Sequence, residues 1–93
     1  MTEYIAQCFD MSLKDSNCYL RGYFKIIDYR YKNPSKNDYS ERHHIVPKCW
    51  FRINGFGNGD RMENIVVLSP KEHLKVHVLL VHYFNSVNDV CMA

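Results

Sequence analysis

The strongest local constraint on folding is the segment Ser69-Pro70-Lys71-Glu72. Serine suits the N-cap of a helix, proline suits the first helical position, and glutamate at the third position can bond back to the N-cap amide. Apolar residues then recur at helical spacing as far as Phe84. We therefore predict a helix from about residue 70 to residue 84, with His73 and His77 one turn apart on the same face.

A second amphipathic helix is predicted nearer the N-terminus, from about residue 16 to residue 31. Leu20, Phe24 and Ile27 share its apolar face with two tyrosines. The run from Lys32 to Glu41 contains proline, serines and two asparagines, which compete with regular structure. We expect this run to be a connector.

Two short strands are expected between the helices. The β-branched and aromatic residues of RHHIVPKCWF, residues 42–51, favour extended structure, and Pro47 ends the strand near that position. Residues 52–62 hold three of the four glycines and predict a long flexible loop, and residues 64–68 predict a second strand. The expected fold class is α+β, with a wide two-stranded hairpin packed on a helix and an additional N-terminal helix.

The length of 93 residues suits one small domain and excludes two independent ones. We expect a single domain over residues 1–93, in which residues 1–40 form a helical support, residues 41–84 the core and residues 85–93 a tail. Twelve Lys and Arg against ten Asp and Glu leave a formal net charge of +2. This charge alone does not indicate a nucleic-acid partner.

The four cysteines, at positions 8, 18, 49 and 91, form no C-x-x-C pair. The N-terminal residues lack the features of a secretory signal, and no stretch approaches the length of a membrane span. We interpret the thiols as reduced, in an intracellular, cytoplasmic protein without a membrane partner.

The histidines are the candidate functional residues. His73 and His77 can point ring nitrogens at one ion if a third ligand comes from a neighbouring strand, and either His43 or His44 could supply it. Three protein ligands leave a coordination position open, as in catalytic sites, and the remaining histidine is then available for proton transfer. A lone helical pair of this kind is more often surface decoration, and His82 lies well off the face of His77.

Three motifs together resemble the HNH endonuclease family, and within it the small HNH proteins of bacteriophages, including the homing type. They are Glu41-Arg-His-His-Ile-Val-Pro47, Asn64-Ile-Val-Val-Leu68 and Glu72-His73-x-x-x-His77-Val-Leu-Leu80. The resemblance covers about half of the chain, from roughly residue 39 to residue 84, and it is specific because the motifs occur together and in order.

The resemblance implies the ββα-metal fold and hydrolysis of DNA phosphodiesters to a 5′-phosphate and a 3′-hydroxyl. It implies that His44 is the general base, and that Asn64 braces the long loop around the site. It also implies that one divalent ion is held by His43, His73 and His77. Imidazole ligands accept Zn, Ni, Mn or, less readily, Mg.

Adjacent strand residues point to opposite faces, so His43 and His44 can share a site only where the strand is irregular. The nearby Pro47 favours such an irregularity.

The expected substrate is DNA, and we expect it to be double-stranded. Candidate phosphate contacts are Arg42, Lys48, Arg52, Arg61, Lys71 and Lys75, each of which is equally compatible with a solvated surface charge. Residues 1–40 are too short for a separate DNA-reading module beside the helix that they contain. Sequence specificity would therefore need a homodimer or a protein partner.

Two alternatives stay open. Cys49 could join the three histidines and close a structural zinc site, which would make the chain a non-catalytic nucleic-acid or protein binding module. The chain could also be an accessory factor of a larger phage complex, because a fold and a site do not identify a biological target.

Overall fold

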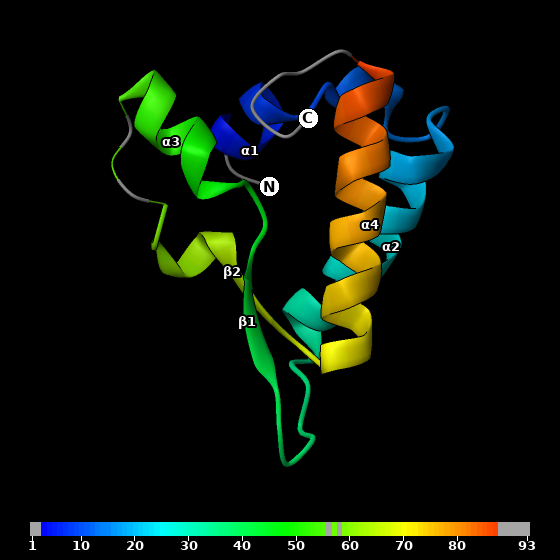
Figure 1. The fold of residues 1–93 in the computed structure, drawn as a ribbon, viewed down its shortest axis with the longest axis vertical. Coiled ribbons are helices and arrows are strands. Elements are labelled where there is room, and N and C mark those ends of the chain that lie inside the picture. The colour runs from blue at the N-terminus through cyan, green and yellow to red at the C-terminus, as the bar shows by residue number, and fades with distance from the viewer. Residues whose placement is uncertain (1–2, 56, 58, 88–93) are drawn as a thin grey trace.

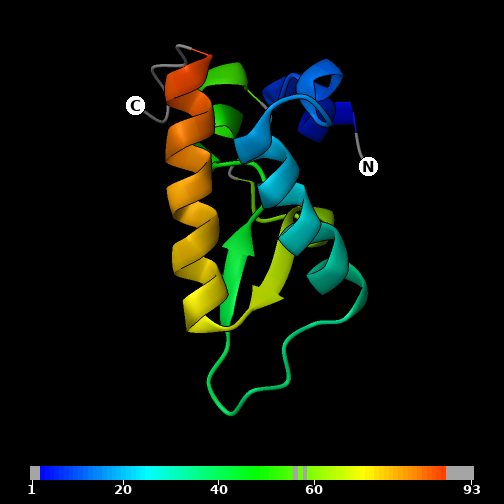
Figure 2. The same ribbon diagram turned by 90° about the vertical axis from the view of Figure 1, so that its right-hand side faces the viewer.

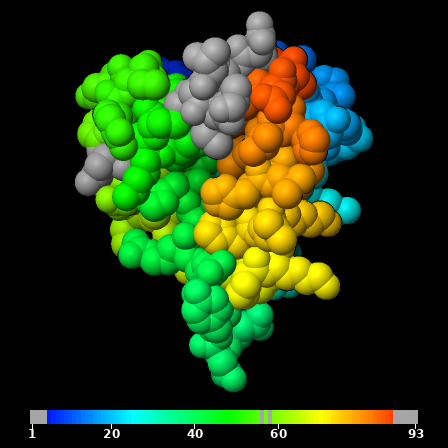
Figure 3. Space-filling view, viewed as in Figure 1, coloured from blue at the N-terminus to red at the C-terminus, as the bar shows by residue number. Residues whose placement is uncertain are grey.

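The computed structural model describes residues 3–55, 57 and 59–87. Its elements in chain order are α1 (Glu3–Cys8), the 3-10 helix η1 (Met11–Leu13), α2 (Cys18–Lys32), β1 (Glu41–His44), α3 (Lys48–Asn54), the 3-10 helix η2 (Met62–Asn64), β2 (Ile65–Leu68) and α4 (Pro70–Ser86). The connector between α2 and β1 projects beyond the helices at one end of the molecule (Figures 1 and 3).

The two strands form an antiparallel pair, in which Glu41 faces Leu68 and His44 faces Ile65. Both long helices, α2 and α4, lie on the same side of this pair (Figures 1 and 2). The α+β class and the antiparallel pair are therefore confirmed. Because side chains alternate along a strand, His43 and Val66 point to the covered face and are buried, while Arg42 points outward.

The core lies between α2, α4 and the covered face of the strands. Aromatic rings form much of it: the buried ring of Phe9 lies 5.3–5.8 Å, centroid to centroid, from Tyr23, Phe24, Tyr83 and Phe84. These distances fall in the range of favourable aromatic pairs. Phe9 follows α1, and the hydroxyl of Tyr83 accepts a bond from the Asp10 amide at 2.8 Å, so the N-terminal segment is joined to α4.

The predicted start of α4 is confirmed. The Ser69 side chain accepts a hydrogen bond from the Glu72 amide, and the Glu72 carboxylate accepts a hydrogen bond from the Ser69 amide. The same carboxylate accepts two bonds from Nε of Arg30, at 3.0 and 3.1 Å, which join α4 to the last turns of α2. This network fixes the first turns of α4, where His73 lies.

The segment after Pro47 differs from the prediction. Residues 48–54 form the helix α3 instead of the end of a strand and the start of a flexible loop. Pro47 is at the N-cap. Gly55, with φ 74°, closes the C-terminus, where its backbone N–H donates a hydrogen bond to the Phe51 carbonyl. Proline before a helix and a left-handed glycine after it favour helix ends, and here they outweigh the strand preference of Trp50 and Phe51.

Smaller differences concern the ends of the chain. The helix α1 was not predicted, α2 begins two residues later than expected, and α4 continues to Ser86. Most of the expected tail, residues 88–93, lies outside the described residues. Among the helices that the structure describes, none is both long and apolar enough to cross a membrane.

Candidate metal centre

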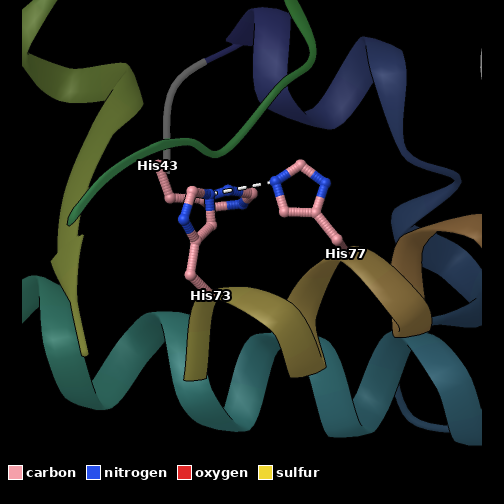
Figure 4. Close-up of side chains that lie close together, drawn as sticks. All are labelled: His43, His73 and His77. Carbon is pink, nitrogen blue, oxygen red and sulfur yellow. Dashed lines mark hydrogen bonds between the residues drawn. The ribbon is translucent and has the colours of Figure 1, made fainter. Parts of the chain in front are cut away.

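Three histidines from two elements meet beside the strand pair. His43 comes from β1, and His73 and His77 come from successive turns of α4 (Figure 4). One ring nitrogen of each lies within 4.8 Å of the others, and Nε2 of His77 is 3.0 Å from Nε2 of His73. Of the adjacent pair, His43 is therefore the residue that joins the helical histidines.

The buried His43 ring is held in one orientation by Tyr23 of α2. Nε2 of His43 lies 2.8 Å from the Tyr23 hydroxyl, which itself donates to the Ile45 carbonyl at 2.8 Å. Since a hydroxyl has one proton, the Tyr23 oxygen must accept from Nε2–H of His43. The lone pair of a neutral His43 is therefore on Nδ1.

Glu41 orients His73 in a similar way. Its carboxylate lies 2.9 Å from Nδ1 of His73 and also accepts a bond from the Tyr39 hydroxyl. These bonds lower the pKa of Glu41, the one with His73 most. The carboxylate accepts from Nδ1–H, so the lone pair of a neutral His73 is on Nε2, toward His77.

The environment favours the neutral form of two of these rings, His43 and His77. Burial, together with the neighbouring histidines, lowers the pKa of His43 from 6.5 to about 3. Burial and then repulsion from His73 also lower the pKa of His77. Neutral imidazole is the form that coordinates a metal.

The donor set fits a single metal ion. Two nitrogen ligands on one tetrahedral zinc would be about 3.3 Å apart, and the two helical Nε2 atoms are 3.0 Å apart. Metal-bound histidines usually donate their other N–H to an oxygen acceptor, as His43 and His73 do here. The cluster of His43, His73 and His77 could therefore hold a metal ion.

His44 lies at the end of β1 and takes a different partner. Its Nε2 is 2.7 Å from Oδ1 of Asp60, and the same oxygen is 3.4 Å from Nζ of Lys48. His44 lines one cleft of about 340 Å³ with all three clustered histidines. The two adjacent histidines reach the same cleft because the strand ends at His44.

Asn64 is completely buried at the end of η2. Its Oδ1 accepts from the Val46 amide at 2.8 Å, and its Nδ2 donates to the carbonyls of Val46 and Gly59 at 3.0 and 2.9 Å. The side chain thus joins the segment after β1 to the loop that carries Asp60. Its assignment to a catalytic site stays a prediction.

The predicted phosphate contacts are not gathered at one place. Arg42 and Lys48 line the histidine cleft, whereas Lys75 lines a different groove, between α2 and α4. Arg52, Arg61 and Lys71 are exposed and do not belong to the residues that line the cleft. Figure 3 shows how α4 (yellow to orange) borders the segment from β1 to α3 (green) on one face.

Three residues that contact the site, Tyr23, Glu41 and Asp60, were not predicted from the sequence. Tyr23 follows the apolar pattern of its helix, so its pattern predicts a core residue. Glu41 had a usable signal, since it lies two residues before His43 and therefore on the same face of the strand. Asp60 had none, because it lies in a glycine-rich loop.

Cys49 does not belong to the histidine cluster. Its sulfur is disulfide-bonded, so the interpretation of the thiols as reduced is wrong at this residue, while Cys8 and Cys18 are free. Cys91 lies outside the described residues. A closed site of three histidines and a Cys49 thiolate is therefore not formed in this structure.

Comparison with known proteins finds three relatives in Enterobacteria phage T4. Probable mobile endonuclease D is 41% identical over 49 residues, which are 50% of this chain and 17% of that protein. Probable mobile endonuclease B is 43% identical over 42 residues, 45% of this chain and 14% of that protein. Probable mobile endonuclease E is 32% identical over 62 residues, 67% of this chain and 40% of that protein.

The chain thus matches less than half the length of each of these relatives. No protein-family model and no solved structure matches it. The partial similarity supports a relationship to phage proteins that are named as endonucleases.

Proposed function

We propose that this chain is a metal-dependent DNA endonuclease of the HNH type, with a ββα-metal core made of β1, β2 and α4. The observation that carries the proposal is the single cleft shared by His44 and by the three clustered histidines. The similarity to phage endonucleases supports the reaction class. The three resembling motifs of the sequence support the HNH type.

In this proposal, His43, His73 and His77 hold one divalent ion. The ion, when bound, stabilises the negative charge that develops on the phosphate and on the leaving oxygen. Tyr23 and Glu41 keep the ligand nitrogens of His43 and His73 directed at one point.

His44 acts as the general base. It accepts a proton from a water molecule, whose oxygen then forms a bond to the phosphorus atom. The bond from phosphorus to the 3′ oxygen breaks, and that oxygen leaves as a 3′-hydroxyl after it takes a proton from solvent. His44 suits this role because its side chain keeps 27% of its surface exposed at the cleft.

Lys48 lines the cleft beside the histidines, and we propose that it binds a phosphate next to the cleaved bond. The Arg42 side chain points to the outer face of the strand pair, and we propose that it binds a phosphate farther along the DNA. The proposed substrate is double-stranded DNA. The contacts predicted for Arg52, Arg61, Lys71 and Lys75 remain proposals for more distant phosphates.

The test is cleavage of supercoiled plasmid by protein that has been stripped of metal and supplied with Mg, Mn, Ni or Zn. We expect metal-dependent nicking by the wild type, and a loss of at least about 100-fold in His44→Ala. The matched control is His82→Ala, since His82 is an exposed histidine of α4 that stacks on Tyr19, outside the cleft.

Calorimetry must show that His44→Ala still binds the metal. Cleavage by His44→Ala at the wild-type rate would show that His44 is not the general base. If the wild type binds metal tightly but cuts no DNA with any of the four ions, the cluster is a structural site and the nuclease proposal is wrong.

A further inference from the structure

Asp60 contacts the proposed base from a position that directly follows an anchored glycine. Gly59, which precedes it, is buried and has a φ of 79°, and its carbonyl accepts a hydrogen bond from Nδ2 of Asn64. Oδ1 of Asp60 then lies 2.7 Å from Nε2 of His44. This distance is at the short end of the range for a hydrogen bond between nitrogen and oxygen, as is usual when one partner is charged.

This bond selects one form of the His44 ring. A carboxylate only accepts, so Nε2 of His44 must carry the proton. The lone pair of the neutral ring is then on Nδ1. In the other neutral form of His44, Nδ1 carries the proton. That form has no lone pair on Nδ1, the nitrogen that points away from Asp60, and so could not accept a proton there.

We propose that Asp60 is a positioning residue for His44, which holds the ring in the Nε2–H form and so makes Nδ1 the nitrogen that takes the proton from water. This inference rests on the proposed function of His44 as a base. When the water proton passes to Nδ1, the ring becomes a cation, and the carboxylate at Nε2 stabilises that cation. The proton later leaves from Nδ1 to solvent, which restores the neutral ring.

Lys48 supports the same arrangement. Its ammonium group lies 3.4 Å from the oxygen of Asp60 that contacts His44. The bond from His44 and, to a smaller degree, the one from Lys48 lower the pKa of Asp60, so the carboxylate stays charged. A charged Asp60 remains an acceptor throughout the reaction.

A purely structural ion pair would behave differently. The side chains of Asp60 and Lys48 are 47% and 50% exposed, and exposed pairs contribute little to stability. If Asp60 had only that role, its removal would change neither the rate of the chemical step nor the protonation site on the His44 ring.

The experiment compares Asp60→Ala and Asp60→Asn with the wild type. The matched control is Asp28→Ala, because Asp28 also lies 3.4 Å from a lysine, Lys14, and its side chain is similarly exposed at 52%. Plasmid nicking over a range of DNA concentrations gives kcat and KM for each protein. Nitrogen NMR of the zinc-loaded protein shows which ring nitrogen of His44 carries the proton.

For Asp60→Ala, we expect kcat to fall about 10-fold to 100-fold, with KM changed by less than about 2-fold. The His44 ring should become a mixture of its two neutral forms. Asp60→Asn keeps an acceptor oxygen and should recover part of the loss, and Asp28→Ala should match the wild type.

An unchanged kcat in Asp60→Ala, or a His44 ring that stays in the Nε2–H form without Asp60, overturns the inference. The NMR measurement needs no DNA cleavage. If the wild type proves inactive, the proposed function fails, while the NMR comparison still decides whether Asp60 sets the form of the ring.

Discussion

The hydroxyl of Tyr23 lies 2.8 Å from Nε2 of His43, and both side chains are almost completely buried. The contact joins the core of α2 to the candidate metal centre across 20 residues of sequence. Because the hydroxyl donates its own proton to Ile45, it leaves His43 one orientation and one free nitrogen. Packing of the core and geometry of the site are therefore coupled at this bond.

Removal of the hydroxyl should weaken metal binding. In Tyr23→Phe, the buried Nε2–H of His43 and the Ile45 carbonyl both lose this partner, which should cost about 1–3 kcal/mol of unfolding free energy. Loss of such an outer contact should weaken zinc affinity by about 10-fold or more. Urea unfolding and calorimetry measure the two effects. Tyr29→Phe, at a tyrosine that is 58% exposed, is the control, and equal zinc affinity in both variants would contradict the prediction.

The sequence was sufficient to predict the elements that have long periodic patterns. The cap at Ser69 and the apolar repeat behind it located α4 and its two histidines, and the repeat around Phe24 located α2. The strand pair followed from the β-branched run of residues 65–68 and its counterpart before Pro47. These signals are local in the sequence, so they predict the elements without any knowledge of the tertiary structure.

The contacts that define the site could not be predicted in this way. Tyr23 and His43 are far apart in the sequence, and an apolar pattern does not show which tyrosine hydroxyl will meet which ring. The position of Asp60 depends on the left-handed backbone of Gly59 and on the bond from Asn64. The helix α3 was missed because its aromatic residues favour strands, while its ends are set by Pro47 and Gly55.

Asn64 should be among the most sensitive polar residues of the core. Its three bonds to the backbone of Val46 and Gly59 are buried, so Asn64→Ala leaves several polar groups without partners. We expect a loss of about 2–5 kcal/mol in unfolding free energy. Asn54→Ala, which removes one exposed bond to the Trp50 carbonyl, should cost less than about 1 kcal/mol. Urea unfolding of both variants checks this, and similar losses would show that Asn64 is not a brace.

The two glycines at Gly55 and Gly59 offer a matched test of the loop. Both have positive φ, 74° and 79°, so alanine should cost about 1 kcal/mol at either position from backbone strain. A Cβ at Gly59 would also lie 2.8 Å from Cδ2 of the buried Phe51 ring, whereas one at Gly55 meets nothing within 4 Å. Gly59→Ala should therefore be clearly less stable in thermal unfolding, and it should nick plasmid more slowly because Asp60 follows it. Equal thermal stability and equal nicking rates of the two variants would contradict this prediction.

Acid should destabilise the metal-free protein, beginning near neutral pH. Burial lowers the pKa of His43 from 6.5 to about 3, so the unfolded chain takes up a proton there before the folded chain does. The contribution of His43 to the free energy of unfolding is therefore fully present above about pH 6.5. It is lost as the pH falls below that value, with a slope that approaches about 1.4 kcal/mol per pH unit for one such group. His77, whose pKa is also lowered, adds to the same slope, whereas Glu41 and Glu72 titrate at lower pH.

Urea unfolding from about pH 5 to pH 7.5, with a chelator present, measures this slope. His43→Asn removes the group that contributes most, so its unfolding free energy should depend less on pH, even though the variant is less stable at neutral pH. His82→Ala changes an exposed histidine and should keep the wild-type slope. A His43→Asn variant with the full wild-type slope would show that the buried ring is not the source of the acid sensitivity.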